Sequence, residues 1–314
     1  MKKMLICGAT GFIGRNVLEY FYKTGEYKIR ATYNTKTPDS DVDVEWVQAD
    51  LNNIADVNRA VAGADIIVQM AATTSGAEDI INRPYIHVTD NALMNSLLLR
   101  AAFDHNVEHF IFPSCTVMYQ PSDSAIAETD FDQNTPLLAK YFGVGNTKVY
   151  IEKMCEFYSR LGRTKHTVMR QSNIYGPHDK YDLKRSHVFG ATITKVMTAN
   201  DTVEVWGSGE EKRDLLHVDD LVRFIEMAIH NQKDAFGLYN VGLGSACSIN
   251  ELVSTVISKS QKDLTVTRDL SKPTIKTNVW LDCSRAQDDI GWRPSIPLEK
   301  GIEMVLDWYE RNIK

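Results

Sequence analysis

The stretch Met4-Leu5-Ile6-Cys7-Gly8-Ala9-Thr10-Gly11-Phe12-Ile13-Gly14 decides the fold of this chain. Its first four residues form a short apolar run that predicts a buried strand, and residues 15–23 continue as a helix. Glycines spaced G-x-x-G-x-x-G between them permit a tight turn and close approach to a pyrophosphate, which binds at the helix N-terminus. An ordinary strand–helix turn is the alternative. We favour dinucleotide binding, with contacts from Gly8, Thr10, Gly11, Phe12, Ile13 and Gly14.

Strand-like and helix-like segments alternate through the first half of the chain. Such alternation is typical of an α/β fold in which helices connect parallel strands. We therefore predict a Rossmann-type doubly wound parallel sheet. The expected strands are residues 4–7, 28–33, 44–48, 64–70 and 109–113, and the expected helices are residues 15–23, 53–61 and 89–106.

The alternation loosens after about Arg170. Residues 173–177 have turn chemistry, residues 188–199 return to a helix, and the last helix is expected from Pro297 to Ile313. We expect residues 1–170 to form a dinucleotide-binding domain. Residues 171–314 are expected to form mainly a smaller C-terminal α/β substrate-binding lobe, interleaved with the first domain. Helix caps are expected at Ser248-Ile249-Asn250-Glu251, at His217-Val218-Asp219-Asp220 and at Ser284.

Composition argues against several classes of function. The 314 residues carry a formal charge of −6, which disfavours binding to nucleic acid or to anionic membranes. No apolar run approaches the ~20 residues of a membrane span, and the N-terminus predicts a strand rather than a secretory signal. The five cysteines are scattered and form no C-x-x-C pair. We expect a cytoplasmic protein with reduced thiols and without a metal site.

The choice of cofactor depends on the end of the second strand. An acidic residue there would bind the ribose diol of NAD, whereas a 2′-phosphate requires neutral or basic groups. No carboxylate occurs between Arg30 and Asp39, and Asn34 and Lys36, with Arg15, suit a phosphate. NADP(H) is therefore favoured over NAD(H). Asp50-Leu51 either flanks the adenine or contributes a helix-capping aspartate.

Several further motifs occur in a characteristic order along the chain. Together with the glycine loop they resemble the extended short-chain dehydrogenase/reductases of the NAD-dependent epimerase/dehydratase family, which act on nucleotide sugars, and in particular the GDP-L-fucose synthases. The resemblance runs from Lys3 to about Tyr309. It rests on Ala71-Ala72, Asn91-Ala92-Leu93-Met94, Ser114-Cys115-Thr116-Val117-Met118-Tyr119, Asn173-Ile174-Tyr175-Gly176-Pro177-His178-Asp179, Ser186-His187-Val188, Val205-Trp206-Gly207-Ser208-Gly209 and Arg213-Asp214-Leu215-Leu216-His217-Val218-Asp219-Asp220.

The resemblance implies a Tyr and a Lys in a Y-x-x-x-K pattern, with a Ser or Thr nearby. In the family the Lys lowers the pKa of the Tyr and binds the nicotinamide ribose, and the hydroxyl orients the sugar oxygen. Lys148 matches the Lys, but the Tyr position is occupied by Val144. Because Gly143 and Gly145 flank Val144, we expect a looped backbone there. Such a loop would bring Tyr141 into the place of the phenol; the alternative for Tyr141 is a packed surface aromatic.

The hydroxyl position also differs from the family pattern. Counting back from Tyr119, it falls on Cys115, with Thr116 beside it, and the family's epimerising Cys reads Val117. The family's second acid/base is retained as His187. A thiol and an imidazole can exchange protons near neutral pH. Cys115 is therefore either a base, after a shift of its loop, or a small buried residue at a strand end.

The residues that the resemblance assigns to the nucleotide sugar are better preserved. Arg213 would bind the diphosphate and Asn173 the diphosphate or sugar, and Lys276 or Lys272 would contact phosphates. Trp206 either lines that pocket or is a core aromatic.

Two functions therefore remain open, each with a nucleotide sugar as partner. One is a GDP-sugar epimerase, 4-keto reductase or both, using NADP(H). The other is a catalytically silent nucleotide-sugar or cofactor-binding protein that lacks the Tyr. The resemblance also implies a homodimer through residues 89–106 and the helix after Lys148, unless these faces pack inside the monomer.

Overall fold

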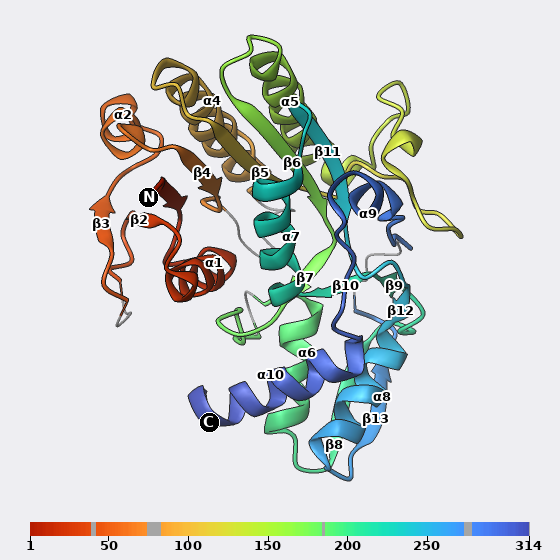
Figure 1. The fold of residues 1–314 in the computed structure, drawn as a ribbon. Helices are drawn as coiled ribbons and strands as arrows, with labels where there is room; N and C mark the ends of the chain where they lie inside the picture. Colours follow the sequence, from red (N-terminus) through yellow and green to blue (C-terminus); the bar gives the residue numbers. More distant parts are fainter. Residues whose placement is uncertain (39–41, 74–82, 184–185, 273–277, 314) are drawn as a thin grey trace.

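The centre of the molecule is a seven-stranded parallel sheet with the order β11-β6-β5-β4-β1-β2-β3 (Figure 1). The computed structural model describes residues 1–38, 42–73, 83–183, 186–272 and 278–313. Strand order reverses between β1 and β4, which creates the crevice where such sheets bind ligands. The predicted doubly wound α/β fold is confirmed. The strands are β1 (Lys3–Cys7), β2 (Lys28–Tyr33), β3 (Glu45–Gln48), β4 (Ile66–Gln69), β5 (His109–Cys115), β6 (Lys165–Gln171) and β11 (Phe236–Val241).

Helices cover both faces of this sheet. On one face lie α2 (Ile54–Val61), α4 (Thr89–Asp104) and α5 (Phe142–Ser159), side by side in Figure 1. On the other face lie α1 (Phe12–Thr24), α7 (Val218–Asn231) and α9 (Ser284–Ile290). Strand side chains alternate between the two cores, as a pleated sheet requires. Along β5, for example, Phe110 and Phe112 belong to the α5 side and Ile111 to the α1 side.

A smaller lobe lies beyond the carboxyl ends of the strands. Its core is formed by α6 (Val188–Thr198), α8 (Ile249–Ser260) and α10 (Leu298–Asn312), packed with short strands (Figure 1). The short strands pair as β7 (Asn173–Tyr175) with β10 (Leu215–His217), β8 (Thr202–Trp206) with β13 (Thr265–Asp269), and β9 (Lys212–Arg213) with β12 (Cys247–Ser248).

The chain passes between these two regions more than once after residue 170. Residues of α7, β11 and α9 return to the central sheet and its core, whereas α10 belongs to the lobe. The division into a dinucleotide-binding domain of residues 1–170 and a lobe of residues 171–314 stays a prediction.

Local sequence signals are partly confirmed. Ser248 and Glu251 form the expected capping box of α8, and the Nδ1 atom of His217 accepts the Asp219 amide at the start of α7. Two expectations are wrong. Residues 173–175 form strand β7, because they pair with β10. Ser284 does not cap α9; the Asp282 carboxylate accepts its amide at 2.8 Å instead.

The first helix is tied directly to the lobe. The Asn16 amide of α1 donates to the carbonyl oxygen of Pro177 at 2.8 Å. One turn later, the Glu19 carboxylate lies 3.2 Å from the Nε2 atom of His178. The His178 hydrogen bond, together with Arg15, lowers the pKa of Glu19 to about 2. Helix α1 therefore contacts both the sheet and the loop that follows β7.

Two properties follow for the part of the chain that the structure describes. None of its helices is long and apolar enough to cross a membrane. No group of three His, Cys, Asp or Glu side chains within the described ranges is arranged to hold a metal ion.

The buried His109 should make the fold sensitive to acid. Its Nε2 atom lies 2.7 Å from the Thr167 hydroxyl, and burial, with the nearby Lys165 charge, lowers its pKa to about 3. The unfolded chain protonates this side chain near pH 6.5. The stability that it contributes is therefore complete above about pH 6.5 and is lost as the pH falls towards 3.

The free energy of unfolding falls between pH 7.5 and pH 5 as the buried His109 becomes costly to keep neutral. We expect this fall to be about 2 kcal/mol smaller in His109→Gln than in the wild type. Urea unfolding at both pH values measures this difference. The exposed His105→Gln is the control and should keep the wild-type difference. An equal loss in His109→Gln and wild type would contradict the assignment.

Candidate active site

The glycine loop follows β1 and brings α1 into close contact with two neighbouring strands. Gly8 has a φ of 69°, and a Cβ atom there would lie 2.6 Å from the Cα atom of Ala71. At Gly14 a Cβ atom would lie 2.2 Å from the Gly8 carbonyl oxygen. Both positions therefore require glycine. Gly8 needs its left-handed backbone conformation and the space left by the missing Cβ atom, whereas Gly14 needs the space alone. Gly11, in contrast, is exposed at the tip of the loop.

The N-terminus of α1 has the features of an anion-binding site. Its N-cap is Gly11, the helix start has no side-chain cap, and its first turn contains no acidic residue. Backbone amides at such a helix start are available to a phosphate, and the helix dipole favours negative charge. Phe12 and Ile13 anchor this turn by packing against the core on the α1 side. The loop therefore fits the pyrophosphate of a dinucleotide.

The segment after β4 forms the opposite side of this loop. The Gln69 side chain accepts the Ala71 amide and donates to the Ala71 carbonyl oxygen, both at 3.0 Å. It also donates to Asn95 of α4 at 3.0 Å. Ala71 is thereby held against Gly8, while Ala72 is exposed. Sequence reasoning named Ala71 and Ala72 but missed Gln69.

The residues expected to choose the cofactor lie around the same loop. Lys36 is exposed, and its Nζ atom lies 3.5 Å from the Thr10 carbonyl oxygen. Asn34 is also exposed, whereas Arg15 is paired with Glu19 at 2.7 Å.

At the end of β3, Asp50 is exposed and Leu51 is buried. The side chain that caps α2 is Asn53, so the alternative of Asp50 as the cap of this helix is wrong.

The backbone around Val144 is helical, contrary to expectation. Helix α5 begins at Phe142, and Val144 lies in its first turn. The flanking glycines serve close packing: a Cβ atom at Gly143 would lie 2.9 Å from Val88, and one at Gly145 would lie 2.7 Å from Leu137. A loop that moves Tyr141 into the place of the missing phenol therefore does not form.

Lys148 lies one helical turn after Val144 and points at the end of β5. Its Nζ atom donates to the Pro113 carbonyl oxygen at 2.7 Å and lies 4.8 Å from the centre of the Phe112 ring. Burial lowers the pKa of Lys148, against the opposing effect of Cys115 and Glu152.

Cys115 is the last residue of β5 and is half-buried. Burial raises the pKa of its thiol, while the Lys148 charge and the Val117 amide oppose that rise. Thr116 follows in a turn, where its carbonyl oxygen accepts the Tyr119 amide at 3.0 Å. The loop shift that would make Cys115 an epimerising base is not observed, because Cys115 stays in β5.

Tyr141, Arg213 and Asn173 connect this strand end to the lobe. Burial raises the pKa of Tyr141, and the charges of Arg213 and Cys115 both act on its phenol. Arg213 ends β9, and burial lowers the pKa of its guanidinium. The Asn173 side chain donates to the carbonyl oxygen of Asp214, the residue that follows Arg213, at 3.2 Å. The structure thus brings Lys148, Cys115, Tyr141, Arg213 and Asn173 into one region between sheet and lobe.

The other predicted residues lie on the lobe. His187 is the N-cap of α6, where burial and the Lys180 charge lower its pKa although part of the ring is exposed. Trp206 is 48% exposed at the end of β8, so the alternative of a core aromatic is wrong. Lys195 and Lys272 lie 5.0 and 5.6 Å from its ring centre. Lys276 lies outside the described residues.

A buried charge network supports the site from behind. Arg170 of β6 pairs with Glu152 of α5 at 2.8 Å, and both side chains are at least 95% buried. Glu152 also accepts the Ser114 hydroxyl at 2.5 Å, and Arg170 donates to the Tyr119 hydroxyl at 3.0 Å. Ser114 precedes Cys115, so the network fixes the strand end that carries the thiol. Sequence reasoning missed Arg170 and Glu152. The available signal was the Glu152 carboxylate, one helical turn after Lys148.

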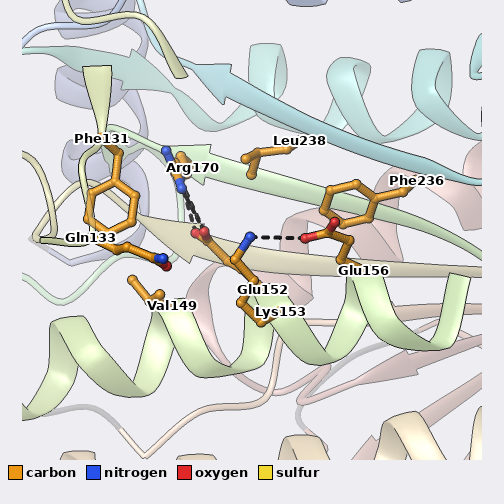
Figure 2. Close-up of a pocket in the computed structure, with 9 residues that line it drawn as sticks. All are labelled: Phe131, Gln133, Val149, Glu152, Lys153, Glu156, Arg170, Phe236 and Leu238. Carbon is orange, nitrogen blue, oxygen red and sulfur yellow. Dashed lines mark hydrogen bonds and ion pairs between the residues drawn. The ribbon is translucent and has the colours of Figure 1, made fainter. Parts of the chain in front are cut away.

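Figure 2 shows a pocket of about 240 Å³ that reaches this ion pair from the outside. It lies between α5 and the edge strand β11 and contains no predicted site residue. Its lining residues are Phe131, Gln133, Val149, Glu152, Lys153, Glu156, Arg170, Phe236 and Leu238.

The fold and the glycine loop identify a class of dinucleotide-binding enzyme, and comparison with known proteins identifies the family. Residues 4–242 match the model of the NAD dependent epimerase/dehydratase family, and the chain belongs to this family.

Among relatives, GDP-L-colitose synthase of Yersinia pseudotuberculosis is 28% identical over 99% of both chains. GDP-L-fucose synthase of Escherichia coli is 30% identical over 79% of this chain and 81% of its own. The structure of UDP-glucose 4-epimerase from Thermotoga maritima has a similar fold, with a TM-score of 0.88, 22% identity and coverage of 99% of this chain and 100% of its own.

Removal of the buried guanidinium should destabilise the protein strongly. Arg170→Met leaves the Glu152 carboxylate buried without its partner, which costs roughly 3–5 kcal/mol. Lys153→Met on the same helix removes only an exposed ion pair with Glu156 and should cost at most about 1 kcal/mol. Denaturant unfolding of both variants checks the difference. Equal stabilities would show that the buried pair does not hold this region.

Proposed function

We propose that this protein is an NADP(H)-dependent enzyme that converts a nucleotide sugar, namely a GDP-linked 4-keto sugar, by epimerisation, reduction at C4, or both. The observation that carries the proposal is that Lys148, Cys115, Arg213 and Asn173 lie in one region between the sheet and the lobe, in a chain whose glycine loop fits a dinucleotide. The family supports this reaction class. The names GDP-L-colitose synthase and GDP-L-fucose synthase support the GDP-sugar.

The residues proposed to hold the cofactor lie along one edge of the sheet. The loop from Gly8 to Gly14 would bind the pyrophosphate, Ala71 and Ala72 would lie along the dinucleotide, and Lys148 would bind the nicotinamide ribose. When bound, the nicotinamide supplies or accepts a hydride. Lys36 supports NADP(H), because its exposed ammonium group lies beside the Thr10 carbonyl oxygen of the loop, where it would attract the negative charge of a 2′-phosphate.

The nucleotide sugar is proposed to lie between the strand ends and the lobe. The Arg213 guanidinium suits a diphosphate, because its planar fork matches phosphate oxygens. Asn173 lies close to Arg213, through its contact with Asp214, and can bind the same group or the sugar. Trp206 offers an exposed aromatic face, and His187 an exposed imidazole that can carry a proton.

A second function is favoured by Val144 alone. A valine cannot transfer a proton, and it occupies the first turn of α5, where the family places a Tyr. If no other group replaces the phenol, the protein would bind a cofactor and a nucleotide sugar without converting them.

The cytoplasmic location and a homodimer through α4 and α5 stay predictions. Leu93 and Tyr150, exposed on these helices, are consistent with such a dimer.

The reaction can be tested with GDP-4-keto-6-deoxymannose in deuterated water, with and without NADPH. We expect deuterium uptake into the sugar without NADPH, through proton abstraction next to the keto group. With NADPH we expect conversion to the reduced sugar. Mass spectrometry measures both products, and calorimetry measures binding. Binding of sugar and NADPH with neither change would identify the silent protein.

The preference for NADP(H) can be tested at Lys36. Lys36→Glu places a negative charge over the loop, so we expect NADPH to bind about tenfold more weakly while NADH binding changes little. Lys23→Glu, at the exposed end of α1, is the matched control. Quenching of tryptophan fluorescence measures both affinities. An equal effect on NADPH and NADH would contradict a role in recognising the 2′-phosphate.

A further inference from the structure

Asp214 lies at the junction of two short strand pairs of the lobe. It follows Arg213, the last residue of β9, and precedes Leu215, the first residue of β10. Strand β9 pairs with β12, and β10 pairs with β7, which begins at Asn173. In Figure 1 these four strands lie between the central sheet and the helices of the lobe. Only 1% of Asp214 is exposed, and a carboxylate so deeply buried requires hydrogen-bond partners.

The partners of the carboxylate are backbone amides from two distant segments. Its Oδ1 atom accepts the Leu243 amide at 2.7 Å, and its Oδ2 atom accepts the amides of Gly244 and Leu281, each at 3.1 Å. Both oxygens act as acceptors, as they do in an ionised carboxylate. Leu243 and Gly244 follow the edge strand β11, which ends at Val241. Asp214 therefore ties the lobe to the end of the central sheet.

The loop after β11 closes directly on this carboxylate. A Cβ atom at Gly242 would lie 2.5 Å from the Oδ2 atom of Asp214. Gly242 does not have a left-handed backbone conformation, so the restriction to glycine there is one of space. A larger residue at this position would displace the loop or the carboxylate.

The main chain of Asp214 holds the two residues that are proposed to bind the diphosphate. Its carbonyl oxygen accepts the backbone amide of Asn173 at 3.1 Å and the Asn173 side-chain amide at 3.2 Å. Arg213 is the preceding residue, and its backbone pairs with Cys247 and forms a bridge with Val279. The places of Arg213 and Asn173 are therefore both set at the backbone of Asp214.

We propose that Asp214 is a positioning residue, whose buried carboxylate holds Arg213 and Asn173 at a fixed place relative to the central sheet so that together they bind the diphosphate of a nucleotide sugar. Asp214 does not touch the ligand; it acts through its two neighbours. Because the carboxylate is bound to the loop after β11, it also fixes their distance from the strand ends beside which the sugar is proposed to lie. This inference rests on the proposed function, because it concerns the substrate-binding residues of that same site.

A second buried aspartate provides a matched control. Asp220 of α7 is also only 1% exposed, and its carboxylate accepts the amides of Ser295 and Ile296 at 2.9 and 2.8 Å. It joins α7 to the segment before α10, whereas Asp214 joins the proposed diphosphate residues to the sheet. A loss of stability is therefore expected at both positions, and a loss of diphosphate binding at Asp214 alone.

Binding of GDP and of NADPH tests the assignment. In Asp214→Asn an NH₂ group that can only donate replaces one oxygen and faces backbone N–H groups, which displaces the junction. We expect GDP to bind about tenfold more weakly, as for the loss of one hydrogen bond to a charged group, and NADPH binding to change little. Asp220→Asn should lose stability in denaturant but keep the wild-type affinity for GDP. Calorimetry measures the affinities. An equal loss of GDP affinity in both variants would show a merely structural role and overturn the inference.

Gly242→Ala perturbs the same contact while the carboxylate is kept. The added Cβ atom must displace the loop or the carboxylate, so we expect weaker GDP binding and unchanged NADPH binding. This variant decides the question if Asp214→Asn does not fold. Wild-type GDP affinity in a folded Gly242→Ala protein contradicts the role of Asp214.

A double-variant cycle tests whether Asp214 acts through Arg213. Once Arg213→Ala has removed the guanidinium, Asp214→Asn has less binding left to disturb. We therefore expect it to weaken GDP binding by only about threefold in the Arg213→Ala background, through Asn173, against about tenfold in the wild type. Full additivity of the two substitutions would show that the carboxylate does not place the guanidinium, and would overturn the inference.

The inference and the proposed function fail in different ways. A wild-type protein that binds neither GDP nor a GDP-linked sugar contradicts the proposed function. A wild-type protein that binds GDP, with unchanged affinity in a folded Asp214→Asn variant, leaves the proposed function standing and overturns the role of Asp214.

Discussion

The buried ion pair between Arg170 and Glu152 is the interaction on which the site depends. It joins β6 to α5, and through the Ser114 and Tyr119 hydroxyls it also fixes the end of β5 and the turn that follows. Tyr119 in turn donates to Asn240 of the edge strand at 2.7 Å. Because each of these groups is buried, the loss of one leaves another without a partner. Helix α5, which carries Lys148, is thus fixed relative to the strand that carries Cys115.

The sequence was sufficient for the architecture and for the place of the glycine loop. Glycine spacing, apolar runs and their alternation are local signals, and they predicted the parallel sheet and the loop between β1 and α1. The same signals failed at Gly143 and Gly145. Glycine there indicated a loop by its intrinsic preference, whereas its actual role is to let α5 approach Val88 and Leu137. Tertiary packing overrode local propensity.

Other features were invisible because they depend on long-range register. Glu152 and Arg170 become partners only when α5 packs on β6, and nothing in the sequence of either segment specifies that contact. Strand β7 exists because Asn173–Tyr175 meets β10, about forty residues later. The neighbours of Cys115 likewise come from three separate segments. The sequence named Cys115, Tyr141 and Lys148 as candidates, but only the fold shows which of them act on one another.

The hydrogen bond from Asn16 to Pro177 and the contact of Glu19 with His178 have a mechanical consequence. Both residues lie on the helix that follows the glycine loop, and both partners lie on the loop that leads into the lobe. A displacement of α1 is therefore transmitted to the lobe without passing through the sheet. Free energy exchanged through such a contact acts equally in both directions. Movement of α1 or of the loop after β7 therefore displaces the other segment as well.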